Sequence, residues 1–506
     1  MQHGSKSRRG HLDMRYKILL GCTLLFGIAV IILAQFSIPT LFSADGYLHI
    51  RMAQFLKEWG PHYDFHWARY SVFARNFADK DFLYHVLLIP FTFFPNIFFG
   101  AKVSAALFTA ALYLIFWWML ARHCRQKYLI LPFLIAFLCS AAFLQSLSQP
   151  RNMIIIIALT LLFTDALIKK NQWVLFIITC VYALTHVSSP YLLLFALLGE
   201  GVRFANEREF SRESIVTVAL GLVAGCLMHP NFPNNLLIFY LNGILVPIFA
   251  LKWGLELGAE FFPTDTRDFV LSYPFILIAL LLLIALGATQ TKKARTSTQI
   301  WLAITGFFFI FSFFSQRYLA HVYPLVLISL ASYLSDWLAA REGLTALRQN
   351  KYLRAATAIA GLLLFILLGL HTYKGFRQRL VSERIYNGHY EAVGALMSRY
   401  IPAGEVIFHA NWSDSQYFIG LNPKDDYFVT LDPIYMYYWD KNLYNLYRET
   451  AFGRAADPYA ALKNIFKVNY GYVGKNYFSG LIAQIRPDPR FEVMAEDGLG
   501  LIFRVK

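Results

Sequence analysis

The sequence predicts a polytopic α-helical membrane protein with an α/β domain at its C-terminal end. Of the 506 residues, 57% are hydrophobic and only 15% are charged, whereas about a quarter of the residues in a typical soluble protein are charged. Apolar runs long enough for membrane helices alternate with short loops rich in Lys and Arg. After Leu370 the density of hydrophobic residues drops, which marks a polar tail.

The first apolar run, residues 18–38, follows a basic N-terminal segment. At about 20 residues it can span a bilayer, and it is longer than the apolar part of a usual signal peptide. We therefore expect an uncleaved first helix. Because loops rich in Lys and Arg stay on the cytoplasmic side, we expect a cytoplasmic N-terminus and a first external loop over residues 38–101.

The remaining runs predict about 11 crossings in all, and an odd number places the polar tail on the outer side. The later crossings are residues 103–121, 129–147, 153–168, 174–185, 191–198, 215–228, 269–287, 300–314, 318–337 and 355–370. Two other apolar runs, residues 82–99 and 236–251, do not fit the alternation of loop charge. We interpret them as juxtamembrane or re-entrant helices.

We accordingly divide the chain into a multi-span domain, residues 1–371, and an external α/β domain, residues 372–506, joined by a linker marked by Arg377, Arg379 and Arg384. In the tail, the patterns predict helices and strands. The helices are expected over residues 390–400 and 458–466, and the strands over 406–410, 427–431, 491–494 and 501–505. The last two strands should form a hairpin around Gly498 and Gly500. The five cysteines show no disulfide or metal spacing.

Isolated charged and imidazole side chains gather at the run ends that we assign to the outer face. They are Asp45, His49, Arg51, Asp79, Asp81, His85, Arg151, His186, His229, Arg317 and His321. The cytoplasmic ends carry Lys and Arg clusters without a comparable set of His and carboxylate groups. Because ionisable groups at membrane depth are costly, this asymmetry indicates chemistry at the outer face.

Three segments of this set resemble known membrane glycosyltransferases. Residues 43–51 read Ser-Ala-Asp-Gly-Tyr-Leu-His-Ile-Arg and resemble the first external loop of oligosaccharyltransferase catalytic subunits. Residues 79–85, Asp-Lys-Asp-Phe-Leu-Tyr-His, resemble the loop before the juxtamembrane helices of lipid-dependent glycosyltransferases. Residues 315–324 resemble their late Ser-x-Arg-Tyr-x-x-x-x-Tyr-Pro element. Protein mannosyltransferases and aminoarabinose transferases share this architecture, so the resemblance implies the GT-C fold.

The resemblance and the chemistry of sugar transfer together suggest roles for these residues. Transfer from a lipid phosphate needs a general base for the acceptor and cations for the leaving phosphate. The predicted catalytic residues are Asp45, His49 and Asp81. The predicted donor-phosphate ligands are Arg151, Arg317 and His321. The resemblance also implies a divalent metal, Mg²⁺ or Mn²⁺, with Asp45 and His49 as candidate ligands.

The acceptor or substrate is expected near His85, His186, Trp412 and Asp414. Residues 412–417, Trp-Ser-Asp-Ser-Gln-Tyr, resemble the Trp-Trp-Asp-Tyr-Gly block with which oligosaccharyltransferases read Asn-x-Ser/Thr sequences. Here Ser413, Ser415 and Gln416 replace the second Trp, the Tyr and the Gly, which argues against those sequences as acceptors.

Structural roles stay open for the same residues. Asp45 could cap a helix, Arg151 and Arg317 could reach lipid headgroups, and Asp414 could occupy a turn.

The sequence thus predicts a glycosyltransferase that takes a sugar from a polyprenyl phosphate or diphosphate and transfers it to an acceptor at the outer face. The acceptor, a protein, lipid or glycan, is left open. Membrane lipid is an expected partner and nucleic acid is not, because loop orientation accounts for the net charge of +15. The expected location is a bacterial inner membrane with the tail in the periplasm or outside. Alternatives are a lipid-linked glycan polymerase or ligase, a transporter, and a non-catalytic glycan sensor.

Overall fold

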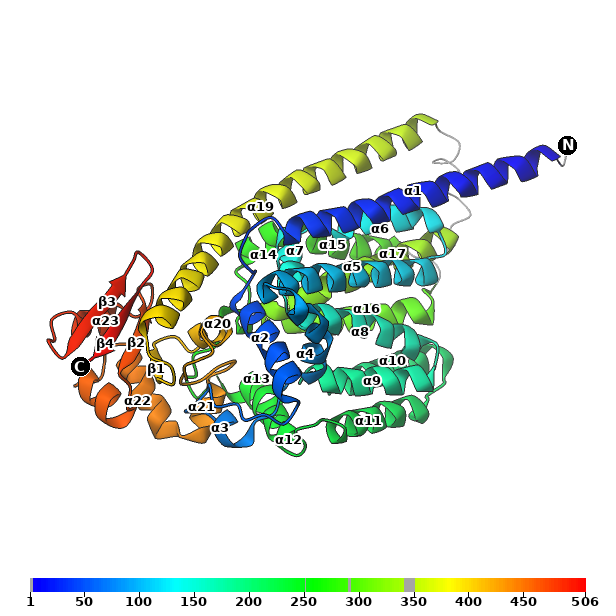
Figure 1. Ribbon diagram of the computed structural model, residues 1–506. Helices are drawn as coiled ribbons and strands as arrows, with labels where there is room; N and C mark the ends of the chain where they lie inside the picture. Colours follow the sequence, from blue (N-terminus) through cyan, green and yellow to red (C-terminus); the bar gives the residue numbers. More distant parts are fainter. Residues whose placement is uncertain (1–2, 251, 290–292, 341–350) are drawn as a thin grey trace.

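The computed structural model describes residues 3–250, 252–289, 293–340 and 351–506. These residues are mostly helical and carry one small sheet. Figure 1 shows the apolar helices side by side in a bundle, with the sheet beyond one end of it and the two chain termini at opposite ends of the molecule.

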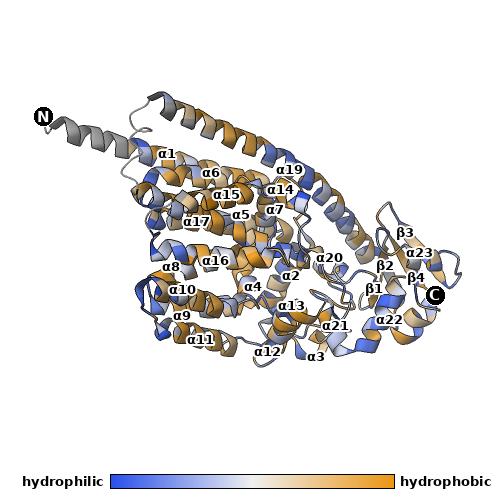
Figure 2. Cartoon of the chain, turned by 180° about the vertical axis from the view of Figure 1, so that it is seen from behind, coloured by the Kyte–Doolittle hydropathy of each residue, from blue (hydrophilic) through white to orange (hydrophobic). Residues whose placement is uncertain are grey.

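The bundle contains the longest apolar helices of the chain, and Figure 2 shows their hydrophobic colouring. Its elements are α1 (His3–Gln35), α5 (Ile97–His123), η2 (Lys127–Leu129), α6 (Ile130–Phe137), α7 (Ala141–Ser148), α8 (Met153–Ile168), α9 (Gln172–Thr185), α10 (Tyr191–Glu207), α11 (Arg212–Leu227), α14 (Thr266–Ser272), α15 (Pro274–Thr289), α16 (Thr296–Ser312), α17 (Leu319–Ala340) and the first half of α19 (Lys351–Tyr400). A helix satisfies all its backbone groups within itself, which hydrocarbon requires.

Among the described residues, four helices are long and apolar enough to cross a membrane alone. They are Met14–Gln35, Ile97–His123, Gln316–Ala340 and Ala358–Tyr400. The number rises to six if two bent pairs are each counted as one span, namely α6 with α7, bent by 74°, and α14 with α15, bent by 89°. Several shorter apolar helices add to these. Helix length does not decide the number of crossings, and the figure of about 11 stays a prediction.

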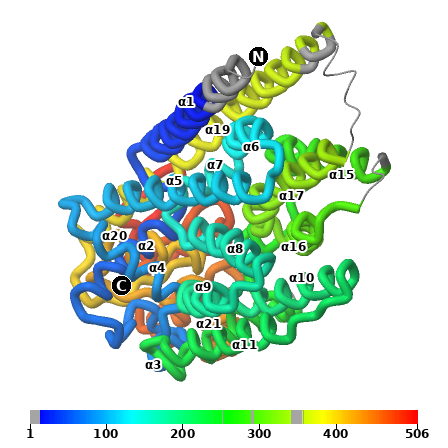
Figure 3. Tube along the Cα trace, turned by 90° about the vertical axis from the view of Figure 1, so that its right-hand side faces the viewer, coloured from blue at the N-terminus to red at the C-terminus, as the bar shows by residue number. Residues whose placement is uncertain are grey.

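Short helices form a layer between the bundle and the sheet. They are α2 (Ala44–Trp59), α3 (Phe73–Asn76), α4 (Phe82–Leu88), η1 (Ile89–Phe93), α12 (Asn234–Ile238), η3 (Phe239–Leu245), α13 (Val246–Phe249), η4 (Ala259–Phe261) and η5 (Gln316–Tyr318). On one edge of the molecule, α1 and α19 run along the same side of the bundle (Figures 1 and 3). The second half of α19 leaves the bundle and leads into the tail.

The tail is built around a four-stranded sheet in the order β1-β2-β4-β3. Strand β1 (Ile407–His409) pairs in parallel with β2 (Tyr470–Gly474), and β4 (Gly500–Val505) pairs antiparallel with β2 and with β3 (Phe491–Glu496). The helices of the tail are α20 (Asp414–Leu421), α21 (Ile434–Trp439), α22 (Lys441–Ala451), η6 (Ala460–Ile465) and α23 (Ser479–Ile485).

The hairpin of β3 and β4 confirms the prediction for the last two strands, and β1 falls within the strand predicted over residues 406–410. The strand predicted over residues 427–431 is wrong. The backbone of Tyr427 instead pairs with the first external loop, donating to the Trp67 carbonyl at 2.7 Å and accepting from the Arg69 N–H at 2.9 Å. Because that loop satisfies its backbone groups, the segment makes only an isolated bridge, between Ala68 and Tyr427.

Two hydrophobic cores organise the molecule. The first fills the helix bundle. The second joins residues of the first external loop, such as Tyr47 and Trp67, to residues of the tail, such as Phe418 and Tyr427. The tail therefore shares its core with the external loop. The boundary predicted at residue 371 stays a prediction.

Candidate active site

Asp45 lies in the first turn of α2 and forms an ion pair with Arg151, whose Nε is 2.7 Å from Asp45 Oδ2. Arg151 belongs to the turn between α7 and α8, directly after Pro150. Gly46 allows this turn to pack closely against α2, because a Cβ there would lie 3.1 Å from the Pro150 ring, closer than an ordinary contact. This close packing accompanies the contact between the predicted base and the predicted phosphate ligand.

Glu260, in η4, extends this contact into a chain of four charges. Its carboxylate lies 3.3 Å from Arg151 Nη1 and 3.1 Å from Arg317 Nη2. Burial opposes ionisation of Glu260, but the two guanidinium groups outweigh it and lower its pKa to about 2. Arg317 also lies over the Phe261 ring, 4.4 Å from its centroid. We call Asp45, Arg151, Glu260 and Arg317 the ion-pair chain.

Sequence reasoning missed Glu260. It lies within a polar segment with three other carboxylates between residues 256 and 268, and nothing in the local sequence distinguishes it from them. Only its contacts with Arg151 and Arg317, which are distant in the chain, reveal it. Two arginines at run ends with only one carboxylate assigned beside them were the one usable signal, since partly buried charges need partners.

Lys80 and Asp81 form a second charged group beside the ion-pair chain. Lys80 Nζ is 2.7 Å from Asp81 Oδ2, and Asn152 donates to Asp81 Oδ1 at 2.6 Å. Asp81 is 1% exposed. Burial alone would raise its pKa, but Lys80 and nearby histidines hold it well below the usual range, so Asp81 is ionised. The Asp81 carboxylate therefore holds the Lys80 ammonium group in position. Sequence reasoning did not select Lys80 as a site residue.

His49 and His85 lie in a buried hydrogen-bonded chain. His85 Nδ1 is 2.6 Å from Asp79 Oδ2, and His85 Nε2 is 2.7 Å from His49 Nδ1. Burial keeps the pKa of His49 well below its ordinary value, so its ring is neutral. His229 adds a contact to the Asp79 carbonyl at 2.9 Å. This chain braces α2 against α4.

Two cavities meet at Arg317 and Met153, which line both. The larger has a volume of about 1010 Å³ and mostly aromatic and aliphatic walls, with polar exceptions that include Lys80, His186 and His321. The smaller has a volume of about 630 Å³ and is lined by polar groups that include Arg151 and Glu260. The ion-pair chain thus reaches both an apolar and a polar space.

The histidines of the apolar cavity are held differently. His186 Nδ1 lies 2.6 Å from the Ser188 hydroxyl, and burial lowers the pKa of His186 to about 3. His321 stacks on Phe308 with 4.6 Å between ring centroids. Its Nδ1 has no hydrogen-bond partner within the described part of the chain. His321 is therefore held by ring stacking rather than by a hydrogen bond at this nitrogen.

Arg379 corrects the sequence analysis, which placed it in the linker. It lines the polar cavity and donates to Gln145 Oε1 at 2.6 Å and to Ser272 Oγ at 2.9 Å. Helix α19 is continuous through this region, so the expected linker is helix.

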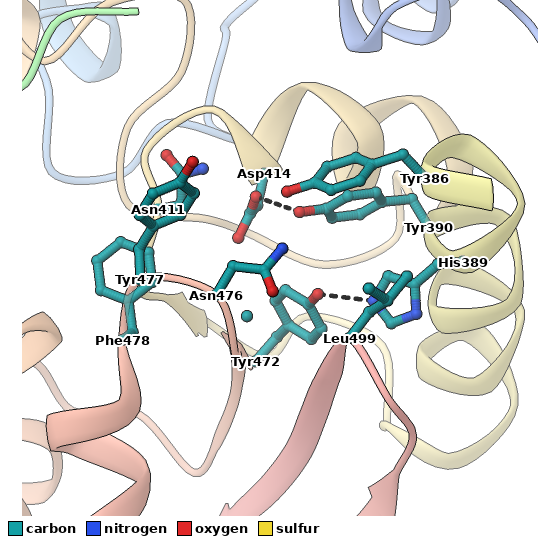
Figure 4. Close-up of a pocket in the computed structure, with 11 residues that line it drawn as sticks. Tyr386, His389, Tyr390, Asn411, Asp414, Tyr472, Asn476, Tyr477, Phe478 and Leu499 are labelled. Carbon is teal, nitrogen blue, oxygen red and sulfur yellow. Dashed lines mark hydrogen bonds between the residues drawn. The ribbon is translucent and has the colours of Figure 1, made fainter. Parts of the chain in front are cut away.

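Trp412 and Asp414 lie apart from the residues above. Asp414 begins α20 and lines a separate pocket in the tail, shown in Figure 4. Burial raises the pKa of Asp414 to about 7. The predicted site residues thus fall into two places, the charged groups beside the cavities and the tail pocket.

A metal at Asp45 and His49 does not fit the arrangement of these side chains. Asp45 is engaged by Arg151, and the His49 Nδ1 faces His85. In the described ranges, no three His, Cys, Asp or Glu side chains are placed to share an ion. The metal expectation therefore receives no support from this geometry.

Comparison with solved structures gives the fold. The structure of ArnT from Cupriavidus metallidurans bound to undecaprenyl phosphate matches with a TM-score of 0.59 and 10% identity, over 96% of this chain and 97% of ArnT. The same protein in the apo state matches with a TM-score of 0.58 and 11% identity, over 95% and 97%. No protein-family model and no curated protein matches the chain. The predicted GT-C membrane fold is confirmed. The closer likeness to oligosaccharyltransferases stays a prediction.

Proposed function

From the fold that the chain shares with ArnT, we propose that it is a membrane glycosyltransferase. It transfers a sugar from a polyprenyl phosphate or diphosphate to an acceptor at the outer face of the membrane. The observation that carries this proposal is the position of the ion-pair chain, which meets an apolar cavity on one side and a polar cavity on the other.

The apolar cavity suits the isoprenoid part of the donor. Burial of apolar surface contributes roughly 25 cal/mol per Å², and the walls offer Leu194, Phe239 and Ile244 among many similar side chains. Lys80 and Arg317 would hold the phosphate at the polar edge. Arg can donate two parallel hydrogen bonds to phosphate. The matching ArnT structure, which contains undecaprenyl phosphate, supports a donor of this class.

In the proposed reaction, an acceptor oxygen forms a bond to the anomeric carbon of the sugar. The bond between that carbon and the phosphate oxygen breaks, and its electron pair leaves on the phosphate. Arg151 and Arg317 counter the charge that develops there. The acceptor proton passes to Asp45 as general base. A single displacement of this kind inverts the anomeric configuration.

Exchange of ion-pair partners would make Asp45 available. An arriving phosphate carries negative charge and competes with Asp45 and Glu260 for the two guanidinium groups. Arg151 moving toward phosphate would release the Asp45 carboxylate for the proton. Asp81 takes part through Lys80, which it holds at 2.7 Å, and His49 supports α2 through His85.

The proposal is tested in cells by the lipid-linked species that accumulate when the chain is absent. Deletion should cause a polyprenyl-linked sugar to build up in lipid extracts measured by mass spectrometry. Complementation with the wild-type chain should remove it. An unchanged lipid-linked pool in the deletion strain would contradict the proposal.

Donor binding gives an independent measurement on purified protein. Arg317→Lys keeps the charge but loses the two-pronged hydrogen bonding, so it should weaken binding of a short-chain polyprenyl-phosphate sugar, and Arg317→Ala should weaken it further. The matched control is Arg75→Ala, because Arg75 is exposed in the same external region and its loss changes the net charge equally. Equal affinities in wild type and Arg317→Ala would remove Arg317 from the site.

A further inference from the structure

The tail contains a small polar pocket that shares no lining residue with the two cavities. It lies where α19, the start of α20 and β2 meet, and Figure 4 shows its side chains. Its volume is about 20 Å³, which suits one group about the size of a water molecule. The principal walls are Tyr386, Tyr390, Tyr472, Tyr477, Asn411, Asn476 and Asp414.

Asp414 is the unusual member of this set. It is 1% exposed, and its Oδ1 accepts a hydrogen bond from the Tyr390 hydroxyl at 2.7 Å. Its Oδ2 has no hydrogen-bond partner in the part of the chain that the structure describes. A buried carboxylate with one oxygen unpaired costs free energy, and each such group in a folded protein calls for an explanation. A ligand that donates to Oδ2 supplies one.

Two neighbouring hydroxyl groups, those of Tyr390 and Tyr472, direct their protons to atoms other than Asp414 Oδ2. The Tyr390 proton points to Asp414. His389 Nδ1 lies 2.6 Å from Asp497, so in the neutral ring it carries the proton and Nε2 accepts. Nε2 therefore accepts a hydrogen bond from the Tyr472 hydroxyl, 2.8 Å away. Asp414 Oδ2 and the lone pairs of Tyr390 and Tyr472 are left as acceptors.

A pocket lined in this way selects a ligand rich in donors and positive in charge. An ammonium group has three N–H donors, matches the size of the space, and neutralises the Asp414 carboxylate. Tyrosine rings around a cation add attraction through their faces. Water offers only two donors and, when Asp414 is ionised, leaves its negative charge uncompensated.

We propose that this pocket binds a primary ammonium group, with Asp414 Oδ2 as its charged partner and the Tyr390 and Tyr472 hydroxyl oxygens as further acceptors. The proposal does not depend on glycosyl transfer. It rests on the unpaired carboxylate oxygen and on the direction of the surrounding hydrogen bonds.

The pocket is rigid at its base and open at its mouth. The Tyr390 ring stacks on Tyr417 with 3.9 Å between centroids and 2° between planes, and His389 holds Tyr472. Tyr477 is 75% exposed. The acceptor groups are thus held in place before a ligand binds, which costs less than binding to a flexible site.

Three small probes test the chemistry with the full-length protein in detergent, by isothermal titration calorimetry. Ethanolamine carries the ammonium group. Ethylene glycol replaces it with a neutral hydroxyl, and tetramethylammonium keeps the charge but has no N–H donor. Ethanolamine should bind, and the other two should bind at least about tenfold more weakly, the scale of a charge-assisted hydrogen bond.

Variants then locate the site. Asp414→Asn keeps the size of the side chain and should reduce ethanolamine affinity about 10- to 100-fold, and Tyr472→Phe should reduce it less. Glu492→Gln is the matched control, because Glu492 is an exposed carboxylate on β3 of the same domain. Circular dichroism checks that each variant is folded.

Several results would overturn the proposal. They are equal ethanolamine affinity in wild type and Asp414→Asn, equal binding of ethanolamine and ethylene glycol, and no binding of ethanolamine by the wild type. If ethanolamine binds as expected, glucosamine in solution and phosphatidylethanolamine in nanodiscs distinguish a sugar from a lipid as the source of the ammonium group. Loss of donor-lipid binding in Arg317→Ala would not affect these measurements, so the two proposals can fail separately.

Discussion

Asp45 and Asp414 each lie in the first turn of a helix, where the helix dipole favours a negative charge. Their surroundings differ. Asp45 meets a guanidinium at 2.7 Å beside the two cavities, so its charge is matched by Arg151. Asp414 has a tyrosine hydroxyl on one oxygen and no partner on the other within the described residues. In the proposed reaction the first carboxylate exchanges partners, and in the proposed ammonium site the second receives a cation.

Asp45→Asn should lower sugar transfer by about 10² or more, the usual scale for loss of a general base. The amide keeps the size of the side chain but cannot take the acceptor proton. In the deletion strain, the variant should leave the lipid-linked sugar accumulated. Asp64→Asn removes an exposed carboxylate from the same external region and should restore the wild-type lipid profile. Full complementation by Asp45→Asn would reduce Asp45 to a structural partner of Arg151.

Asp414→Asn should stabilise the tail at pH 8 and have little effect near pH 4. Burial raises the pKa of Asp414 from 3.8 to about 7, so between these values the folded state holds a proton that the unfolded chain releases. Stability therefore falls as pH rises through this window, by up to about 4 kcal/mol. The amide has no charge, and its own unpaired N–H offsets part of the gain, leaving about 1–3 kcal/mol.

The measurement is the melting temperature of wild type and variant between pH 4 and pH 8, with Glu492→Gln as the control. The Tyr390 hydroxyl and the His389–Asp497 pair face the same pocket and also affect the melting temperature. The difference in melting temperature between wild type and Asp414→Asn, rather than either value alone, therefore reports on Asp414. A difference that does not change with pH would contradict the assignment.

Helix α19 connects the bundle to the tail through a row of polar side chains spaced four residues apart. Arg379, Glu383, Asn387 and Glu391 lie on one face, as the spacing of 3.6 residues per turn requires. Glu383 accepts from Gln145 Nε2 at 2.7 Å, and Glu391 accepts from the Tyr47 hydroxyl at 2.6 Å. This row holds the helix against α7 at one end and against the first external loop at the other.

Asn387→Ala should destabilise this contact by about 1–3 kcal/mol, because it leaves buried partners unsatisfied. Asn387 donates to the Leu41 carbonyl at 2.8 Å and accepts from the Tyr417 hydroxyl at 2.5 Å. Gln378→Ala, at an exposed position of the same helix, is the control. Thermal unfolding monitored by tryptophan fluorescence should shift only for Asn387→Ala. An equal shift in both variants would mean that helix propensity, rather than the row of contacts, sets the stability.

The elements that the sequence predicts well are those fixed by local pattern. Apolar runs in the sequence predict α1, α5 and α17, and alternating apolar residues on either side of Gly498 and Gly500 predict the hairpin of β3 and β4. The strand expected at residues 427–431 failed because the loop around Trp67 takes its hydrogen bonds. Asp45, Arg151 and Arg317 were found from charge at run ends. Glu260 was not, because its role exists only through contacts 109 and 57 residues away in the chain.

At the scale of the whole molecule, the second core places the first external loop and the tail on one side of the membrane. Tyr47 packs against Tyr417 with 5.4 Å between ring centroids, and Tyr427 pairs with the backbone at Trp67 and Arg69. Residues that share one core cannot lie on opposite faces of a bilayer. The apolar cavity borders the tail, because Asn242 in the cavity wall donates a hydrogen bond to Asp432 of the tail at 3.4 Å.

Reporter fusions test on which side these parts lie. The basic N-terminal segment predicts a cytoplasmic start of the chain, so the loop after α1 and the tail that packs on it should both be outside. Alkaline phosphatase, which is active only after export, should be active when fused after Lys506 and inactive when fused after Lys127, in a basic loop at the other end of α5. Green fluorescent protein at the same positions should give the reverse pattern. Phosphatase activity after Lys127 together with fluorescence after Lys506 would mean that the orientation is reversed and that the ion-pair chain lies at the cytoplasmic face.

The shared core leads to a further prediction that does not depend on orientation. Single cysteines in place of Asp64 and Glu492, which are both exposed, should react with a membrane-impermeant thiol reagent from the same side of the membrane.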